Sequence, residues 1–346
     1  MKALFIGGTG TISSAISRLA VKSGWEVFHL NRGNREDEFN KLGVKRIHCD
    51  IRSEEAPKIR KKAEKALAGG KFDVVADFIA FIPDHVKKDF DIFNGLCGQY
   101  IFISSASAYQ KPLSSYLITE SSPLANPFWK YSRDKIACED FLIREYRESG
   151  FPVTIIRPSH TYDERSVPLG VHGANGSWQV LKRMIDGKPV IIHGDGESLW
   201  TITHNSDFAH AFLRLMGNIH AIGEAIQITS DETVTWNQIY HIIAGALGVP
   251  LKAVHVASEF LDECSRGLYD FGGALLGDKA NSVVFDNTKL KRLVPDFRAT
   301  TRADEGLKMT IANILASPEL QRGDPAFDTW CDKIIAAVKT AKSEFI

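Results

Sequence analysis

Short apolar runs alternate with longer amphipathic stretches along the first half of the chain. An apolar run at 2–6 is followed by a glycine-rich turn, an amphipathic stretch at 15–23 and a second apolar run at 26–30. This order predicts a strand–helix–strand unit at the start of the chain. The same alternation predicts further strands at 44–48, 74–79, 100–104 and 153–157, and helices at 54–68, 85–96 and 130–149.

The predicted strands are apolar along their whole length, without the polar residue at every second position that a half-exposed strand shows. Such strands are typical of a parallel sheet that is covered by helices on both faces. We therefore predict an α/β fold, a Rossmann-type doubly wound parallel sheet with a smaller C-terminal α/β substrate lobe.

The amino-acid composition changes after Pro158, where the chain becomes rich in Gly, His, Asn and Trp. Helices are expected at 233–247, capped by Asp231 or Thr233, and at 304–315. The expected division is a dinucleotide-binding domain at 1–165, to which 201–228 returns, and a substrate-binding lobe at 166–346.

Composition narrows the class of protein. The 346 residues include 42 Lys and Arg against 42 Asp and Glu, which argues against a chain devoted as a whole to polyanions. No apolar window is long enough for a membrane span, and no signal-peptide pattern follows Met1. The cysteines are scattered, without a CxxC pair or metal-ligand spacing, so we expect reduced thiols, no metal and a cytoplasmic location. They are Cys49, Cys97, Cys138, Cys264 and Cys331.

A glycine motif follows the first predicted strand. In Gly7-x-x-Gly10-x-x-Ser13, the first glycine permits a tight turn and the second lets the backbone approach a pyrophosphate. The N-terminus of the next helix supplies free N–H groups and a partial positive charge. This strand–turn–helix context predicts a dinucleotide site.

The end of the second strand bears on the choice of dinucleotide. Asn31, Arg32 and Arg35 stand there in place of the acidic residue that would bind the ribose hydroxyls of NAD. We expect NADP, with NAD as the alternative, and Arg32 as the main partner of the 2′-phosphate. The arginines could instead form a solvated loop face.

Tyr131 and Lys135 lie four residues apart on the long helix predicted at 130–149 and so project from one face. A neighbouring ammonium stabilises a phenolate, which makes this pair a candidate for proton transfer beside a carbonyl or alcohol. The strand predicted at 100–104 leads into small hydroxyl residues, where Ser105 could hold the substrate oxygen.

In this order of motifs, the chain resembles the extended short-chain dehydrogenase/reductase superfamily, in its NAD(P)-dependent epimerase/dehydratase group. It is also similar to a divergent branch that includes the chloroplast stem-loop-binding proteins, through Asn31-Arg32-Gly33, Asp77-Phe78-Ile79 and a short following helix. The motifs that carry the main resemblance are Gly7-x-x-Gly10, Asp50-Ile51, Ser104-Ser105-x-x-x-Tyr109, Tyr131-x-x-x-Lys135, Arg157-Pro158-x-x-x-Tyr162, Gly194-Asp195-Gly196, His204-x-x-Asp207 and Asp286-Asn287-Thr288-Lys289-Leu290.

The resemblance implies a role for each matching residue. Ser105 would orient the reacting oxygen, Tyr131 would move the proton, and Lys135 would lower the tyrosine pKa and hold the nicotinamide ribose. Ser105, Tyr109, His160 and Trp200 would contact the substrate. The residues expected at the cofactor are Gly7, Thr9, Gly10, Thr11, Ile12, Asn31, Arg32, Arg35, Asp50, Ile51, Phe78, Ile79, Ala80, Ile103, Lys135, Pro158 and Ser159.

Two departures from the family pattern bear on the reaction. Ala106 and Ser107 stand where family dehydratases carry an acidic pair, so we do not expect a 4,6-dehydratase. Trp200 stands where nucleotide-sugar epimerases tend to carry an Arg that meets the diphosphate. A tryptophan can stack on a ring but cannot neutralise a diphosphate.

We therefore expect an NAD(P)-dependent oxidoreductase or epimerase that acts by hydride transfer on a secondary alcohol or ketone of a sugar or nucleotide-sugar-like substrate. The motifs do not choose between epimerase and reductase. The alternative is an RNA-binding regulatory protein that keeps the dinucleotide site; the stretch 52–71 has a surplus of basic residues but no interleaved aromatic residues. Dimers are usual in the families that the chain resembles, so a homodimer is a further expectation.

Overall fold

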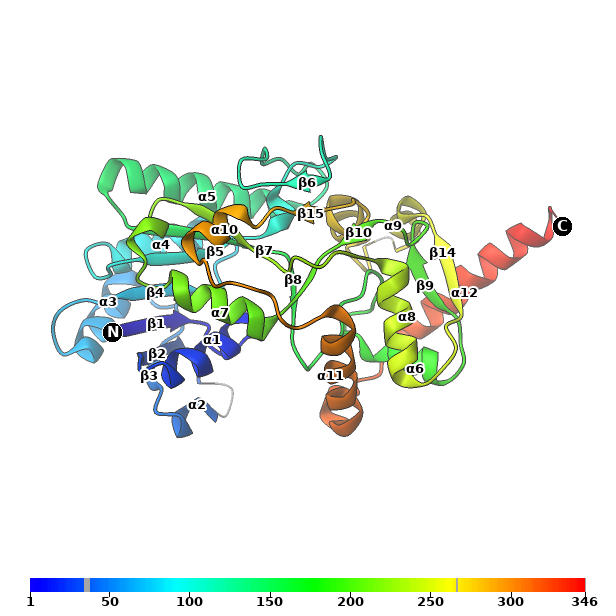
Figure 1. The fold of residues 1–346 in the computed structure, drawn as a ribbon, viewed down its shortest axis with the longest axis horizontal. Helices are drawn as coiled ribbons and strands as arrows, with labels where there is room; N and C mark the ends of the chain where they lie inside the picture. The colour runs from blue at the N-terminus through cyan, green and yellow to red at the C-terminus, as the bar shows by residue number, and fades with distance from the viewer. Residues whose placement is uncertain (34–37, 266, 346) are drawn as a thin grey trace.

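The computed structural model describes residues 1–33, 38–265 and 267–345. Its centre is a seven-stranded parallel sheet in the order β12–β7–β5–β4–β1–β2–β3 (Figure 1). This is the order of a doubly wound fold, in which the chain builds from β1 to one edge and then to the other. The strands are β1 (Lys2–Ile6), β2 (Glu26–Asn31), β3 (Lys45–His48), β4 (Val74–Asp77), β5 (Tyr100–Ile103), β7 (Val153–Pro158) and β12 (Ala225–Ile228).

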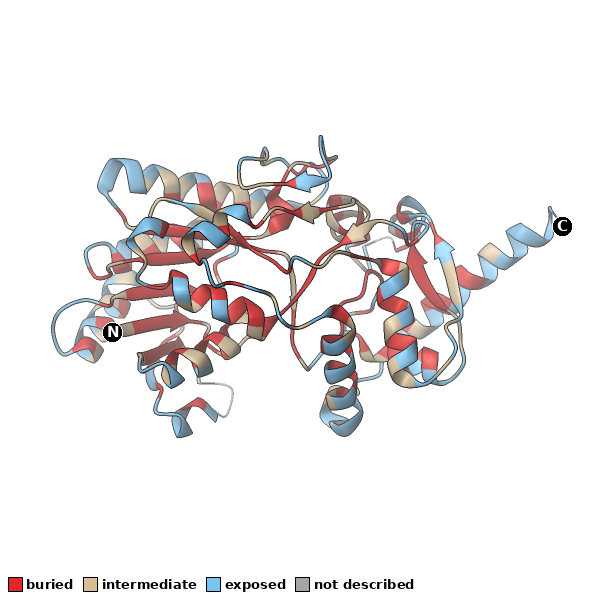
Figure 2. Cartoon of the chain, in the orientation of Figure 1, coloured by how far each residue is buried: buried red, intermediate tan, exposed pale blue. Residues whose placement is uncertain are grey.

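Helices cover both faces of the sheet. In Figure 2 the central strands are buried, while the edge strand β3 buries only Ile47 and the helices bury one side and expose the other, as the amphipathic pattern requires. One core lies between the sheet and each layer of helices. The helices of the first face are α3 (Ala56–Leu67), α4 (Pro83–Phe93) and α5 (Lys130–Ser149), and those of the second are α1 (Thr11–Lys22), α7 (Asn205–Leu215) and α10 (Thr288–Leu293); the short α2 (Glu38–Lys41) precedes β3.

A third hydrophobic core lies beyond the carboxyl ends of the strands, built mainly from residues after 160. Its helices are α6 (Trp178–Ile185), α8 (Trp236–Leu247), α9 (Ser258–Ser265), α11 (Ala303–Ala316) and α12 (Pro325–Ser343), whose end projects from the body (Figure 1). Two-stranded pairings join β6 (Leu117–Ile118) with β15 (Val284–Phe285), β8 (His160–Tyr162) with β11 (Ile202–His204), β9 (Val190–His193) with β14 (Ala253–Val256), and β10 (Leu199–Trp200) with β13 (Val234–Thr235).

The structure confirms the predicted α/β class and parallel sheet. The long helix spans 130–149 as predicted. The helix expected at 85–96 begins earlier, at Pro83, because proline suits the first turn of a helix. The cap expected at Asp231 or Thr233 was wrong: the helix begins after Thr235, whose side chain accepts from Gln238 N in a capping box.

Two later segments return to the sheet. β12 pairs with β7 at the edge, and α7 packs beside α1 on one face. This happens within the stretch 201–228. α10 makes a second return, which the sequence analysis did not include, and it places Leu290 in the same core as α1 and α7. The chain therefore passes several times between the sheet with its helices and the C-terminal part of the molecule.

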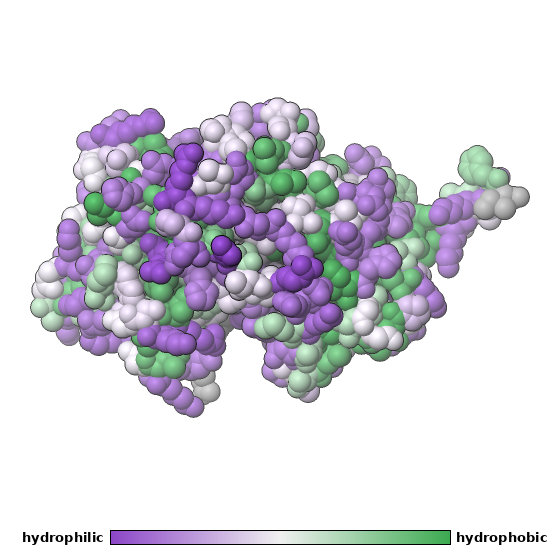
Figure 3. Space-filling view, viewed as in Figure 1, coloured by the Kyte–Doolittle hydropathy of each residue, from purple (hydrophilic) through white to green (hydrophobic). Residues whose placement is uncertain are grey.

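Polar residues spread over the face of the molecule seen in Figure 3. In the described ranges, no helix combines the length and apolar character needed to cross a membrane. Nor do the described His, Cys, Asp and Glu side chains gather in groups of three that could hold a metal ion. All five cysteines are free thiols, and Cys264 is the one among them that is not fully buried.

Candidate active site

Two neighbouring hollows lie at the carboxyl edge of the sheet. The first, of about 500 Å³, runs along the ends of β1, β2 and the segments that follow β3 and β4, and we call it the groove. It is lined by Gly7, Thr9, Gly10, Leu30, Asn31, Arg32, Gly33, Cys49, Asp50, Ile51, Arg52, Ile79, Phe81 and His85.

The glycine turn shapes one end of the groove. Gly7 has φ +80°, and a Cβ there would lie 2.5 Å from Ile79 Cγ2, so a larger residue fits neither the backbone nor the space. Ser13 closes the turn, because its hydroxyl donates to Gly7 O at 2.7 Å and accepts from Gly10 N at 2.8 Å. A Cβ on Gly10 would meet nothing closer than Ser13 Oγ at 3.4 Å and would extend into the groove.

This turn fits a dinucleotide. The bare backbone at Gly10 leaves room for a pyrophosphate, and the first turn of α1 directs its backbone N–H groups to the same place. Asn31 and Arg32 line the groove where β2 ends, and Asn31 Oδ1 accepts from Gly33 N at 3.0 Å. Arg32 is exposed there. The predicted Arg35 lies outside the described residues.

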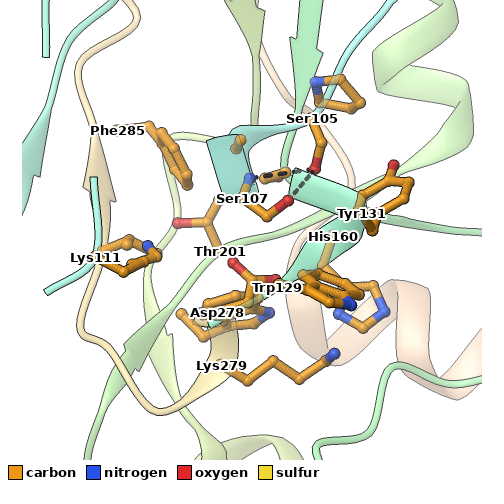
Figure 4. Close-up of a pocket in the computed structure, with 15 residues that line it drawn as sticks. Ser105, Ser107, Lys111, Trp129, Tyr131, His160, Thr201, Asp278, Lys279 and Phe285 are labelled. Carbon is orange, nitrogen blue, oxygen red and sulfur yellow. Dashed lines mark hydrogen bonds between the residues drawn. The ribbon is translucent and has the colours of Figure 1, made fainter. Parts of the chain in front are cut away.

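The second hollow, of about 240 Å³, lies between the sheet edge and the C-terminal part, and we call it the cavity (Figure 4). It contains Ser105, Tyr131, Pro158, Ser159, His160 and Trp200 of the predicted site. The other residues that line it are Ala106, Ser107, Lys111, Trp129, Thr201, Asp278, Lys279, Val283 and Phe285.

Ser105 is held by a chain of hydroxyl groups. It caps a short 3₁₀ helix, and its Oγ accepts from Ser107 N at 3.2 Å and lies 2.8 Å from Ser107 Oγ. The buried Ser132 donates to Ser107 Oγ at 2.7 Å. The Ser105 side chain is therefore fixed at the wall of the cavity, where it can meet a substrate oxygen.

Tyr131 lies on the side of the cavity that is nearest to Phe81 of the groove. It lines the cavity, and its ring lies 6.4 Å from that of Phe81, which lines the groove, and 4.9 Å from that of Trp129. Burial raises the pKa of Tyr131 to about 12, although the neighbouring Ser105 hydroxyl lowers it in part. Its hydroxyl is therefore protonated at neutral pH and can donate a proton.

Lys135 is buried one turn further along α5. Its Nζ donates to Ala80 O and Ile103 O, both at 2.6 Å, and lies 5.7 Å from the centre of the Tyr131 ring. Burial lowers the pKa of Lys135 to about 8. The ammonium thus joins the segments that leave β4 and β5, and it sits behind the tyrosine ring in the structure.

Several predicted site residues lie beside these hollows. Phe78 packs edge-on against Phe5, and Ile12 packs against the same core. Thr11 lies at the N-terminus of α1, where its hydroxyl accepts from Arg165 at 3.1 Å. Tyr109 belongs to the core, because it is buried and its hydroxyl donates to Gln227 at 3.0 Å.

The sequence analysis did not single out Lys111, Trp129, Asp278 or Lys279. Lys111 comes from the loop after β5. Asp278 and Lys279 come from the end of the π-helix η3 (Gly272–Lys279). Close packing explains the glycines of this helix, because a Cβ on Gly273 would lie 2.1 Å from Trp129 Cδ1. In the sequence, the spacing of the glycines of η3 was the one indication that this segment packs closely near the cavity.

A buried ion pair braces α5, the helix that carries Tyr131 and Lys135. Glu139 of α5 accepts two hydrogen bonds from Arg157 of β7, at 3.0 and 2.6 Å, and a third from Ser104 Oγ. The guanidinium also donates to Glu120 O at 3.1 Å. This network ties α5 to the two strands that lead into the cavity.

The basic stretch at 52–71 is largely compensated. Arg52 pairs with the buried Asp77, and Arg60 pairs with Glu64. Lys58 and Lys62 both form an ion pair with Glu54. Four of the seven basic residues therefore have an acidic partner, which weakens this stretch as an electrostatic surface for RNA.

Comparisons with known proteins show the family to which the chain belongs. The model of the NAD dependent epimerase/dehydratase family matches residues 3–229. The chain is 23% identical over 301 residues to 2′-dehydrokanamycin reductase of Streptomyces kanamyceticus, covering 86% of this chain and 80% of that one. It is 27% identical over 259 residues to the chloroplast stem-loop binding protein of 41 kDa b of Arabidopsis thaliana, covering 72% of this chain and 64% of that protein.

Solved structures share the fold. The UDP-glucuronic acid 4-epimerase of Bacillus cereus, solved in complex with NAD, superposes with a TM-score of 0.71 at 19% identity and covers 94% of this chain and 100% of its own. The family match spans the strands from β1 to β12, the glycine turn and the cavity residues up to Trp200. The chain belongs to the NAD dependent epimerase/dehydratase family.

Proposed function

We propose that this protein transfers a hydride between a nicotinamide dinucleotide and a secondary alcohol or ketone of a sugar or nucleotide-sugar-like substrate. One observation carries the proposal: Tyr131 and Ser105 line the cavity, and the Tyr131 ring lies 6.4 Å from that of Phe81, which lines the groove. In this proposal, residues 1–165 with 201–228 form the dinucleotide-binding domain and 166–346 form the substrate lobe.

A bound nicotinamide dinucleotide would supply or accept the hydride. The groove residues Gly7, Gly10 and Arg32 would hold it, and Pro158 and Ser159 would face its reactive end from the cavity. Arg32 favours NADP, because its guanidinium can pair with a 2′-phosphate where an acidic residue would repel it.

The protein's own residues handle the oxygen of the substrate. Ser105 donates a hydrogen bond to the carbonyl, and Tyr131 gives the proton that turns it into a hydroxyl as the carbon is reduced. The raised pKa of Tyr131 keeps its hydroxyl protonated before the transfer. Lys135, positively charged behind the ring, stabilises the phenolate that remains until solvent returns the proton.

The chemistry of a 4,6-dehydratase is not part of the proposal. Ala106 and Ser107 occupy the places of the acidic pair, and Ser107 is engaged by Ser132. Whether the keto product leaves or is reduced again from its other face separates a reductase from an epimerase. A lasting change in nicotinamide absorbance on adding substrate would indicate the reductase.

Tyr131→Phe tests the proposal. With NADPH and a panel of keto sugars, and with NADP⁺ and the corresponding alcohols, the variant should lose about 10²- to 10⁴-fold in rate, the usual contribution of a general acid–base. The matched control is Tyr116→Phe, since Tyr116 is 64% exposed and lies outside the cavity. An unchanged rate in Tyr131→Phe would refute the assignment.

A further inference from the structure

The cavity contains a group of charged side chains that the proposed hydride transfer does not use. Lys111 is 3% exposed and Lys279 is 9% exposed, and both line the cavity together with Asp278. Figure 4 shows the three side chains around the same hollow as Ser105 and Tyr131. They come from the loop after β5 and from the end of η3, so two distant segments place them together.

The two ammonium groups have little compensation in the structure. Among the described residues, the Lys111 ammonium makes no hydrogen bond, and neither lysine has a carboxylate within 4.0 Å. Lys279 Nζ has one long contact, 3.5 Å to Ala274 O. Burial lowers the pKa of both lysines, although Asp278 raises it in part. A charge on a largely buried side chain without an ion-pair partner is costly, and an anionic group in the cavity would remove part of that cost.

The net charge of the group indicates what kind of anion fits. Two lysines and one aspartate carry a formal charge of +1; burial raises the pKa of Asp278, and Lys111 and Lys279 oppose that rise. His160 adds none, because burial lowers its pKa to about 3 and keeps the ring neutral. A single carboxylate balances this charge, whereas the second charge of a phosphate monoester would meet Asp278.

The size and walls of the cavity limit the rest of the ligand. Its volume of about 240 Å³ lies below the range of roughly 300–1,000 Å³ that drug-sized ligands fill. Trp129 and Phe285 give it flat apolar walls, and Ser105 and Thr201 give it hydroxyl groups. A single polyhydroxylated ring or chain fits these dimensions better than a nucleotide-linked sugar.

We propose that the substrate is a free sugar acid, whose carboxylate lies in the cavity among the charged side chains of Lys111, Lys279 and Asp278 while its reacting carbon lies at Ser105 and Tyr131. This inference rests on the proposed function, because it names the substrate class of the same site. Asp278 then acts against acidic ligands, so that a monocarboxylate is preferred to a dianion.

Calorimetric titration of the Tyr131→Phe protein, in which turnover is slowed, in the presence of saturating NADP⁺ tests this inference. The variants below are made in the same background. D-glucuronate and D-galacturonate should bind at least tenfold more tightly than D-glucose and D-galactose. Lys111→Met and Lys279→Met should each weaken binding of the acids at least tenfold without changing the neutral sugars. Asp278→Asn should strengthen binding of the acids, a gain that a merely structural role would not produce. Lys339→Met, an exposed lysine of α12, is the matched control, and thermal melts of each variant check folding.

Several results would overturn the inference. These are equal affinity for acids and neutral sugars, no binding of either acid, tighter binding of sugar 6-phosphates, or tighter binding of UDP-glucuronate than of glucuronate. Lysine-dependent binding of the acids by a protein that transfers no hydride to or from them or the keto-sugar panel would refute the proposed function alone. Hydride transfer on neutral or nucleotide-linked sugars, without lysine-dependent acid binding, would refute this inference alone.

Discussion

Replacing Glu139 by glutamine perturbs the buried ion pair between α5 and β7. The side chains of Glu139 and Arg157 are 4% and 6% exposed, so water cannot replace the lost charge. After the change, the guanidinium keeps the carbonyl of Glu120 at 3.1 Å and the hydroxyl of Tyr109 at 3.4 Å, and neither is charged. Removing one partner of such a pair costs about 3–5 kcal/mol, and we expect the free energy of unfolding to fall by that amount.

Urea unfolding followed by tryptophan fluorescence measures this loss. Glu148→Gln, on the exposed side of the same helix, is the control and should change the free energy by less than about 0.5 kcal/mol. The double variant Glu139→Leu with Arg157→Met should regain most of the stability, because it removes both buried charges. A loss below about 1 kcal/mol in Glu139→Gln would refute the reasoning that this pair is desolvated.

Three further changes test the groove and Lys135, the lysine behind the Tyr131 ring. Arg32→Ala should weaken NADPH binding about tenfold or more, the value of a charge-assisted hydrogen bond, and leave NADH binding unchanged; an equal loss for both would contradict the 2′-phosphate contact. Gly10→Val should abolish dinucleotide binding in a fluorescence titration while changing the free energy of unfolding by only about 1 kcal/mol, since a Cβ there makes only an ordinary contact, 3.4 Å from Ser13 Oγ; retained binding would contradict the placement of the pyrophosphate. Lys135 has a pKa of about 8 in the folded protein and about 10.4 when unfolded, so between these pH values the unfolded chain binds the extra proton and this contribution raises stability as pH rises. Lys135→Met should remove that contribution, and an unchanged pH dependence of unfolding would contradict it.

Most of the sheet could be predicted from the sequence because its strands are local apolar runs. β7 is buried along its whole length, and its sequence shows this directly. β12 escaped prediction as a strand because it is short and carries the polar Gln227 at its centre. In the fold, Gln227 donates to Ile118 O and Asp286 O, and these partners come from distant segments.

The site residues differ in the same way: some are placed by residues close in sequence, and others by contacts between distant segments. The turn at Gly7 and the placement of Tyr131 on α5 depend on residues close in sequence, and the structure places both beside a hollow. Lys111 and Lys279 depend on two segments that meet only in the folded protein, and isolated lysines in a sequence usually indicate exposed surface. Tyr109 was expected at the substrate. It comes soon after β5, and its side chain turns into the core instead.

The late arrival of β12 has a consequence for how the protein is made. β7 pairs with β5 on one side, while its other side awaits a strand that is synthesised only after residue 224. Until then, an apolar edge with unpaired backbone groups is presented by the nascent chain, and such edges recruit other strands. We infer that a chain released before residue 228 aggregates, and that pauses in translation between β7 and β12 reduce the yield of folded protein.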